Sequence, residues 1–190
     1  MTYKNLLNEL SYVNHSRDKR TYYAKMVLEN PDLVPLLLQI LFDVNKDIGS
    51  RAGWVLESVC KKNIFILKPY IDDFTTQMPK VYLDSAVRTV AKICECLIKN
   101  HIDKKVPAFK QFLKPIHIER IITLSFDYLI GDHRVAPKVY AMQSLFWLSV
   151  EFPWILPELQ TILEQNYPNE CSGYKARARK ILDKIKLKSE

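Results

Sequence analysis

The chain has 190 residues, of which 48% are hydrophobic and 26% charged, and its formal net charge is +7. This composition is ordinary for a globular domain and excludes collagen-like, low-complexity and disulfide-stapled chains. The four cysteines are irregularly spaced, so we expect free thiols in a reduced, cytoplasmic compartment. The longest apolar stretch, residues 33–42, is well short of the about 20 residues of a membrane span, which argues against a membrane partner.

Helical periodicity runs through the whole chain, and no segment has the turn chemistry of a β-hairpin. Helices predicted over residues 2–13 and 17–29 make a degenerate first unit, about residues 1–30. Four further pairs follow, each with a first helix (A) and a second helix (B). The A helices are expected near residues 31–43, 64–78, 116–130 and 153–166, and the B helices near 47–62, 82–100, 134–151 and 172–187.

These pairs predict a single all-α domain over residues 1–190. The segment 101–114 is expected to be an insertion, a loop with a turn or two of helix, and the helix over about 172–188 a basic C-terminal cap. Some A helices begin with proline: the segment from Pro31 aligns without gaps on the segment from Pro153. Proline is favourable in a first helical turn because the N–H that it lacks would have no partner there.

A basic residue, two spacers and a small or aromatic residue recur in the B helices. The first copy is Arg51-Ala52-Gly53-Trp54. Two equal steps of 37 residues on either side of a step of 50 are typical of a repeat array with one insertion. The four copies begin at Arg51, Arg88, Lys138 and Lys175.

In this period, in its proline-led A helices and in the Val87-Arg88-x-x-Ala91 core of a B helix, nearly the whole chain resembles the HEAT and armadillo-like repeat families. The chain is also similar to short bacterial all-helical proteins. The resemblance implies a right-handed α-solenoid of four to five HEAT-like helix pairs, each burying its face against its neighbours.

The same resemblance implies a structural ladder, in which an Asp pairs with the basic residue of the B helix. Asp47 precedes Arg51 by four residues, and Asp84 precedes Arg88 by four. Each pair therefore shares one helix face. The third pair is looser and the fourth copy has no Asp at this place, as expected of a terminal cap.

Candidate partner-binding residues lie on the B helices, which usually line the concave surface of such arrays. Trp54 and Tyr140 fall within the repeated motif, where an aromatic side chain could face a ligand. From residue 171 to the end there are seven basic residues and two acids, so most of the net charge belongs to the last helix. The candidate cations are Arg134, Lys138, Lys175, Arg177 and Arg179.

These cations have two interpretations. They could form a basic stripe that binds phosphates or an acidic peptide. Alternatively, the motif cations are structural, with stems that cover the contact between repeats, and the last helix is a solvated cap with lysines near the negative end of its dipole. If the candidate cations point into one groove with an exposed Trp54 or Tyr140, nucleic-acid binding is favoured; if they pair within the chain, it is not.

No set of residues predicts catalysis, a metal or a cofactor. The four histidines are scattered, with no pair at metal-ligand spacing on one helix face, and there is no glycine-rich phosphate loop. Some short bacterial helical proteins that this chain resembles carry an adenylosuccinate lyase name. Lyases of that superfamily use a loop ending in Met-Pro-x-Lys-x-Asn, of which Met78-Pro79-Lys80 is only a fragment.

The leading hypothesis is thus a non-enzymatic, cytoplasmic helical-repeat scaffold that binds a macromolecular partner, a protein, through its B-helix face. The alternative is a nucleic-acid binder, similar to the alkylpurine DNA glycosylases that share the HEAT-like architecture. The charge geometry of the B helices separates the two hypotheses.

Overall fold

The computed structural model describes residues 1–14, 16–43, 47–103, 109 and 111–189. These residues form ten α-helices joined by turns and short 3-10 helices, and no strand occurs in the described ranges. The predicted all-α class is therefore confirmed. None of these helices combines the length and the apolar content that a membrane crossing requires.

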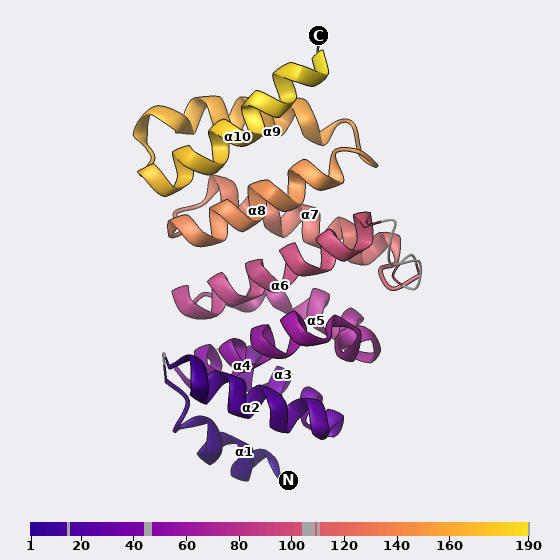
Figure 1. Ribbon diagram of the computed structural model, residues 1–190, viewed down its shortest axis with the longest axis vertical. Coiled ribbons are helices and arrows are strands. Elements are labelled where there is room, and N and C mark those ends of the chain that lie inside the picture. The colour runs from indigo at the N-terminus through magenta and orange to yellow at the C-terminus, as the bar shows by residue number, and fades with distance from the viewer. Residues whose placement is uncertain (15, 44–46, 104–108, 110, 190) are drawn as a thin grey trace. The chain divides into compact units, whose positions relative to one another are not determined.

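The chain forms two compact units, Met1–Cys96 and Leu97–Glu190. The predicted single domain and right-handed HEAT-like solenoid stay predictions. In chain order the helices of both units follow the predicted succession of A and B elements (Figure 1).

Unit 1 is organised around one central helix, α4. This helix packs against α1, α2, α3 and the 3-10 segment η2, and it buries Ala52, Val55, Leu56 and Val59. The α-helices of unit 1 are α1 (Tyr3–Leu10), α2 (Arg17–Glu29), α3 (Val34–Phe42), α4 (Ile48–Lys62), α5 (Ile71–Gln77) and the larger part of α6 (Asp84–Ile102). Its 3-10 segments are η1 (Pro31–Leu33), η2 (Ile64–Tyr70) and η3 (Met78–Lys80).

Helix starts in unit 1 follow local capping chemistry. The Thr2 hydroxyl oxygen accepts a hydrogen bond from the backbone N–H of Asn5 at 3.3 Å, and the Asn63 side chain accepts one from the N–H of Phe65 at 3.1 Å. Such side-chain oxygens satisfy N–H groups that have no partner within the helix. The predicted A helix over 64–78 differs from expectation, because it is 3-10 over η2, which contains Pro69, and α-helical only from Ile71.

Unit 2 is organised around α8 in the same way. Helix α8 packs against α7, α9 and α10, and in Figure 1 α8 and α10 lie in one layer with α7 and α9 behind them. Tyr174 of α10 is fully buried, as are Leu145 of α8 and Leu159 of α9. The elements are α7 (Pro115–Ile130), α8 (Val135–Leu148), α9 (Ile155–Asn166), η5 (Tyr167–Asn169) and α10 (Ser172–Ser189).

The predicted insertion over 101–114 is partly described. Its first two residues extend α6, and residues 104–108 and 110 lie outside the described residues. Phe109 and Phe112 are buried, with their rings stacked 4.2 Å apart. These two rings therefore contribute to a core.

Candidate functional site

The B helices α4 and α6 approach each other closely at Gly53. A Cβ atom on Gly53 would lie 3.2 Å from Cγ2 of Thr89 on α6 and 3.3 Å from Cδ1 of Leu41 on α3. Thr89 is fully buried, and its hydroxyl donates to the carbonyl oxygen of Ser85 at 3.0 Å. The glycine of the first motif copy thus allows the two helices to pack without displacing their neighbours.

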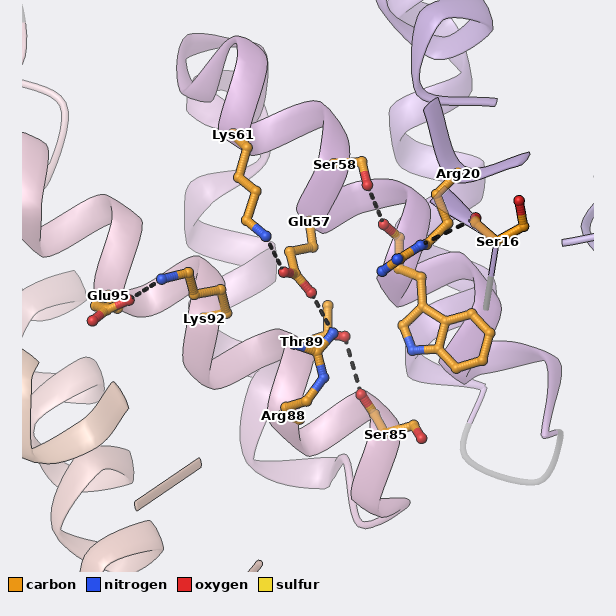
Figure 2. A network of polar contacts seen from close by, with 11 residues as sticks. Ser16, Arg20, Glu57, Ser58, Lys61, Ser85, Arg88, Thr89, Lys92 and Glu95 are labelled. Atoms are coloured by element: carbon orange, nitrogen blue, oxygen red, sulfur yellow. Dashed lines mark hydrogen bonds and ion pairs between the residues drawn. The ribbon is translucent and has the colours of Figure 1, made fainter. Parts of the chain in front are cut away.

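A buried carboxylate joins the same two helices. Glu57 of α4 is 4% exposed. Its oxygens accept hydrogen bonds from Lys61 Nζ at 2.5 Å, one turn later on α4, and from Arg88 Nη2 on α6 at 2.6 Å (Figure 2). A buried carboxylate needs such partners because an unpaired charge in the interior is strongly destabilising. The two cations keep 50% and 30% of their side chains exposed, so they carry the positive charge outward.

A second carboxylate on α6 repeats this arrangement. Glu95 is buried, and Lys92 Nζ donates to its Oε2 within the same helix (Figure 2). The Lys92 side chain is 24% exposed, whereas that of Glu95 is 8% exposed. In both cases the acid lies inward and the cation lies at the surface.

Seven side chains of α4 and α6 that reach solvent form one surface, which we call the α4–α6 face. Their spacing of three or four residues puts them on one stripe of each helix. All seven are half-buried except Lys61, which is exposed. The face consists of Arg51, Trp54, Ser58 and Lys61 of α4 and Ser85, Arg88 and Lys92 of α6.

Three cysteines of α4 and α6 have thiols whose pKa is raised by burial. Burial raises the pKa of the Cys60 thiol, and it raises the pKa of Cys94 to about 12. Cys94 also lies with its sulfur 3.8 Å from that of Met78. Burial raises the pKa of Cys96 as well. A nucleophilic cysteine needs a lowered pKa, so these thiols serve packing. All four cysteines are free, as expected, but Cys171 is exposed.

The four motif cations all have acceptors within the chain. Arg51 Nη1 donates to the carbonyl oxygen of Ser11, just after α1, and Arg88 pairs with Glu57. In unit 2, Lys138 pairs with Glu170 at 2.7 Å, and Lys175 Nζ donates to the carbonyl oxygen of Pro168 at 3.0 Å. The repeated basic residue therefore connects each B helix to another part of its own unit or to the residues just before the helix.

The remaining predicted cations of α10 also have partners. Arg177 Nη1 donates to Oε1 of Gln143 on α8 at 2.7 Å, and Arg179 Nε donates to the Tyr167 hydroxyl at 3.2 Å. Arg179 and Tyr167 help to line a cavity of about 330 Å³ between α9 and α10. Its wall carries two acids as well as two bases, and the other lining residues are Glu164, Pro168, Leu182, Asp183 and Lys186.

The other predicted site residues are divided between the two units. Trp54 lies half-buried in unit 1, whereas Tyr140 lies half-buried on α8 in unit 2, and Arg134 is exposed at the start of α8. Asp47 and Asp84 are exposed at the starts of α4 and α6. The ion pair described for Arg88 is with Glu57, and the Asp-to-basic ladder stays a prediction.

Sequence reasoning missed the buried acceptors Glu57, Glu95 and Gln143. A signal was present for Glu57, since it is a single charge between apolar residues of α4, from Val55 to Cys60. A lone acid on an apolar helix stretch is informative because buried charges require partners.

Within the described ranges, no group of three or more His, Cys, Asp or Glu side chains is placed to hold a metal ion. Comparison with protein-family models, with curated proteins and with solved structures finds no match to this chain.

Proposed function

We propose that this chain is a non-enzymatic helical-repeat scaffold, a right-handed α-solenoid of HEAT-like pairs, that binds a protein partner through its B helices. The α4–α6 face carries the proposal. It combines a half-buried tryptophan with Lys61, Arg88 and Lys92, whose charged groups are held by the buried Glu57 and Glu95. Tryptophan and arginine are enriched at the centres of protein interfaces.

The contacts of the motif cations support a scaffold. Arg51, Arg88, Lys138 and Lys175 each hydrogen-bond within the chain. A repeated residue that holds neighbouring segments together maintains the array, and the residues that vary between repeats are then available for a partner. The free thiols agree with the proposed cytoplasmic location.

The same contacts favour a protein over a nucleic acid. Lys138, Lys175, Arg177 and Arg179 all have acceptors within unit 2. Protein cations that neutralise phosphates release the counterions condensed on the nucleic acid, and Lys138, which already has a carboxylate partner in Glu170, contributes little to that release.

Site-specific photo-crosslinking in an extract of the source cells tests the proposal. A benzophenone amino acid replaces Ser58 or Ser85 on the α4–α6 face, and Asp72 or Thr76, exposed on α5 of the same unit, as the matched controls. We expect discrete protein adducts from Ser58 and Ser85 and none from α5. Adducts to nucleic acid, or protein adducts from the α5 positions alone, would overturn the proposal.

A further inference from the structure

Charge is divided between the two helix layers of unit 2. Helices α8 and α10 carry eight lysines and arginines and one acid, Asp183. Helices α7 and α9 carry four acids, all exposed, and one base, the half-buried Arg120. The four acids are Glu119, Asp127, Glu158 and Glu164. In a chain of net charge +7, the layer formed by α7 and α9 is therefore locally acidic.

An exposed aromatic pair connects α7 to the start of α9. Trp154, the residue before α9, keeps 55% of its surface exposed. Its ring stacks on that of Phe126 of α7, with the ring centroids 6.0 Å apart and the planes inclined by 22°. An aromatic side chain of the core is covered on all sides, whereas more than half of the Trp154 surface stays available to another molecule.

Acids flank this pair on both helices. Glu119 precedes Phe126 by seven residues and Glu158 follows Trp154 by four, so each acid shares a helix face with its aromatic residue. Asp127 directly follows Phe126. Among the described residues, none of these three acids has an ion-pair partner. We call these three acids and the two aromatic residues the α7–α9 face.

We infer that the α7–α9 face is a second interaction surface, which binds a basic segment of a partner protein. This inference goes beyond the proposed function, because it concerns the A helices of unit 2 and not the α4–α6 face. Tryptophan attracts cations more strongly than the other aromatic side chains, and a guanidinium stacks flat on its ring. A carboxylate beside the ring accepts two parallel N–H groups of an arginine.

The charges of the face decide which kind of ligand fits. Nucleic acids and anionic lipid surfaces carry phosphates, which Glu119, Asp127 and Glu158 repel. An apolar ligand gains only the contact with Trp154. A basic segment gains contacts with both the ring and the carboxylates, so charge complementarity favours it.

Fluorescence anisotropy on the full-length chain tests the inference. The probes are a short fluorescein-labelled peptide of Arg with interspersed Gly and the same peptide with Gln for every Arg. The net charge of +7 repels a basic peptide from the chain as a whole, so binding reports on a local acidic surface. We expect the Arg peptide to bind and the Gln peptide not to bind. The E119Q/E158Q variant should bind the Arg peptide about fivefold more weakly, since two exposed charge pairs are lost.

Two further variants separate the aromatic contact from the charge. W154A should weaken binding about threefold, because it removes the ring and leaves the acids. The matched control is D18N/D32N, which removes two exposed acids of unit 1 and should change the affinity less than twofold. Absence of Arg-peptide binding, equal binding of the Gln peptide, equal weakening by both double variants, or an unchanged affinity of folded W154A overturns the inference. If W154A loses helical circular dichroism, E119Q/E158Q, which changes only exposed side chains, decides alone.

A second copy of the chain is the competing occupant, because α10 is basic. We expect a monomer in sedimentation velocity of the chain alone. Self-association that E119Q/E158Q abolishes would overturn the separate partner and identify the second copy as the occupant. The photo-crosslinking positions Ser58 and Ser85 lie in unit 1, so this inference and the proposed function fail separately.

Discussion

The two units differ in the polar group that is buried where successive B helices pack together. In unit 1 the contact between successive B helices, α4 and α6, contains a buried carboxylate, Glu57, which accepts from two cations. In unit 2 the contact between α8 and α10 contains a buried amide, Gln143, which accepts from Arg177 alone among the described contacts.

This difference has a physical consequence. A buried amide is satisfied by one or two hydrogen bonds, whereas a buried carboxylate also needs positive charge nearby. The carboxylate therefore requires cations at the edge of the α4–α6 contact, and those cations remain part-exposed. The buried carboxylate of unit 1 therefore holds Lys61 and Arg88 in place at the surface.

Alkaline pH should separate the two units most strongly. The folded-state pKa of Cys94 is about 12, raised by burial, and that of Tyr23 is about 12, raised by burial and by its hydrogen bond to Glu9. Burial also raises the pKa of Cys60. All three groups lie in unit 1. A folded state that holds its protons more tightly than the unfolded state is stable below the unfolded pKa values and loses stability as pH rises above them.

We therefore expect the free energy of unfolding of unit 1 to fall by several kcal/mol between about pH 9 and pH 12. Trp54 fluorescence in a W147F/W154F variant during urea unfolding reports on unit 1. The C60A/C94A variant is the control and should show a shallower decline. A free energy of unfolding that does not change with pH in the parent chain would contradict the raised pKa values of these three groups.

Removing one cation should have a smaller effect on an acid that has two cationic partners than on an acid that has one. Glu57 keeps Lys61 when Arg88 is lost, so R88M should lower the free energy of unfolding by only about 1 kcal/mol. Glu170 pairs with Lys138, and their side chains are 20% and 13% exposed. K138M should therefore cost about 2–3 kcal/mol, discounted for this partial exposure from a fully buried pair.

Urea unfolding of both variants at neutral pH measures the difference. The double variant K61M/R88M serves as the control for redundancy, since it removes both cations from Glu57 and should cost more than the two single changes together. If the loss of unfolding free energy in the double variant equals the sum of the losses in the two single variants, the two cations act independently.

Thiol labelling gives the smallest effect and the simplest comparison. At mildly alkaline pH a thiol-exchange reagent should react first with the exposed Cys171 of unit 2. Cys60 and Cys94 should react only after unfolding, because burial keeps both thiols protonated. The C171S variant should lose the fast phase; a fast phase that survives in a C96S/C171S variant, which also lacks the half-buried Cys96, would mean that unit 1 opens locally.

Much of the fold could be predicted from the sequence because the helices follow from the local spacing of apolar residues. The B helix expected over 47–62 is observed as Ile48–Lys62, and the last helix, expected over about 172–187, begins at Ser172. Ile181 and Ile185, four residues apart on one face of this last helix, are both 2% exposed. Helical spacing and proline positions act over a few residues, so a single sequence reveals them.

The partners of the basic residues could not be predicted in this way. Arg88 pairs with Glu57 across 31 residues, and Arg177 bonds Gln143 across 34. Spacing within one helix pointed to Asp84 for Arg88, because only contacts at three or four residues can be inferred without a fold. Contacts between helices depend on how those helices pack.

The sequence by itself determined the helices, their order and the repeat of a basic residue in each B helix, since these follow from local propensity and spacing. Only the tertiary structure decided that Glu57 and Glu95 are buried and which acceptors within the chain the motif cations reach. Burial and pairing arise when distant segments exclude water together, and the free energy of a charge depends on that environment more than on its neighbours in sequence.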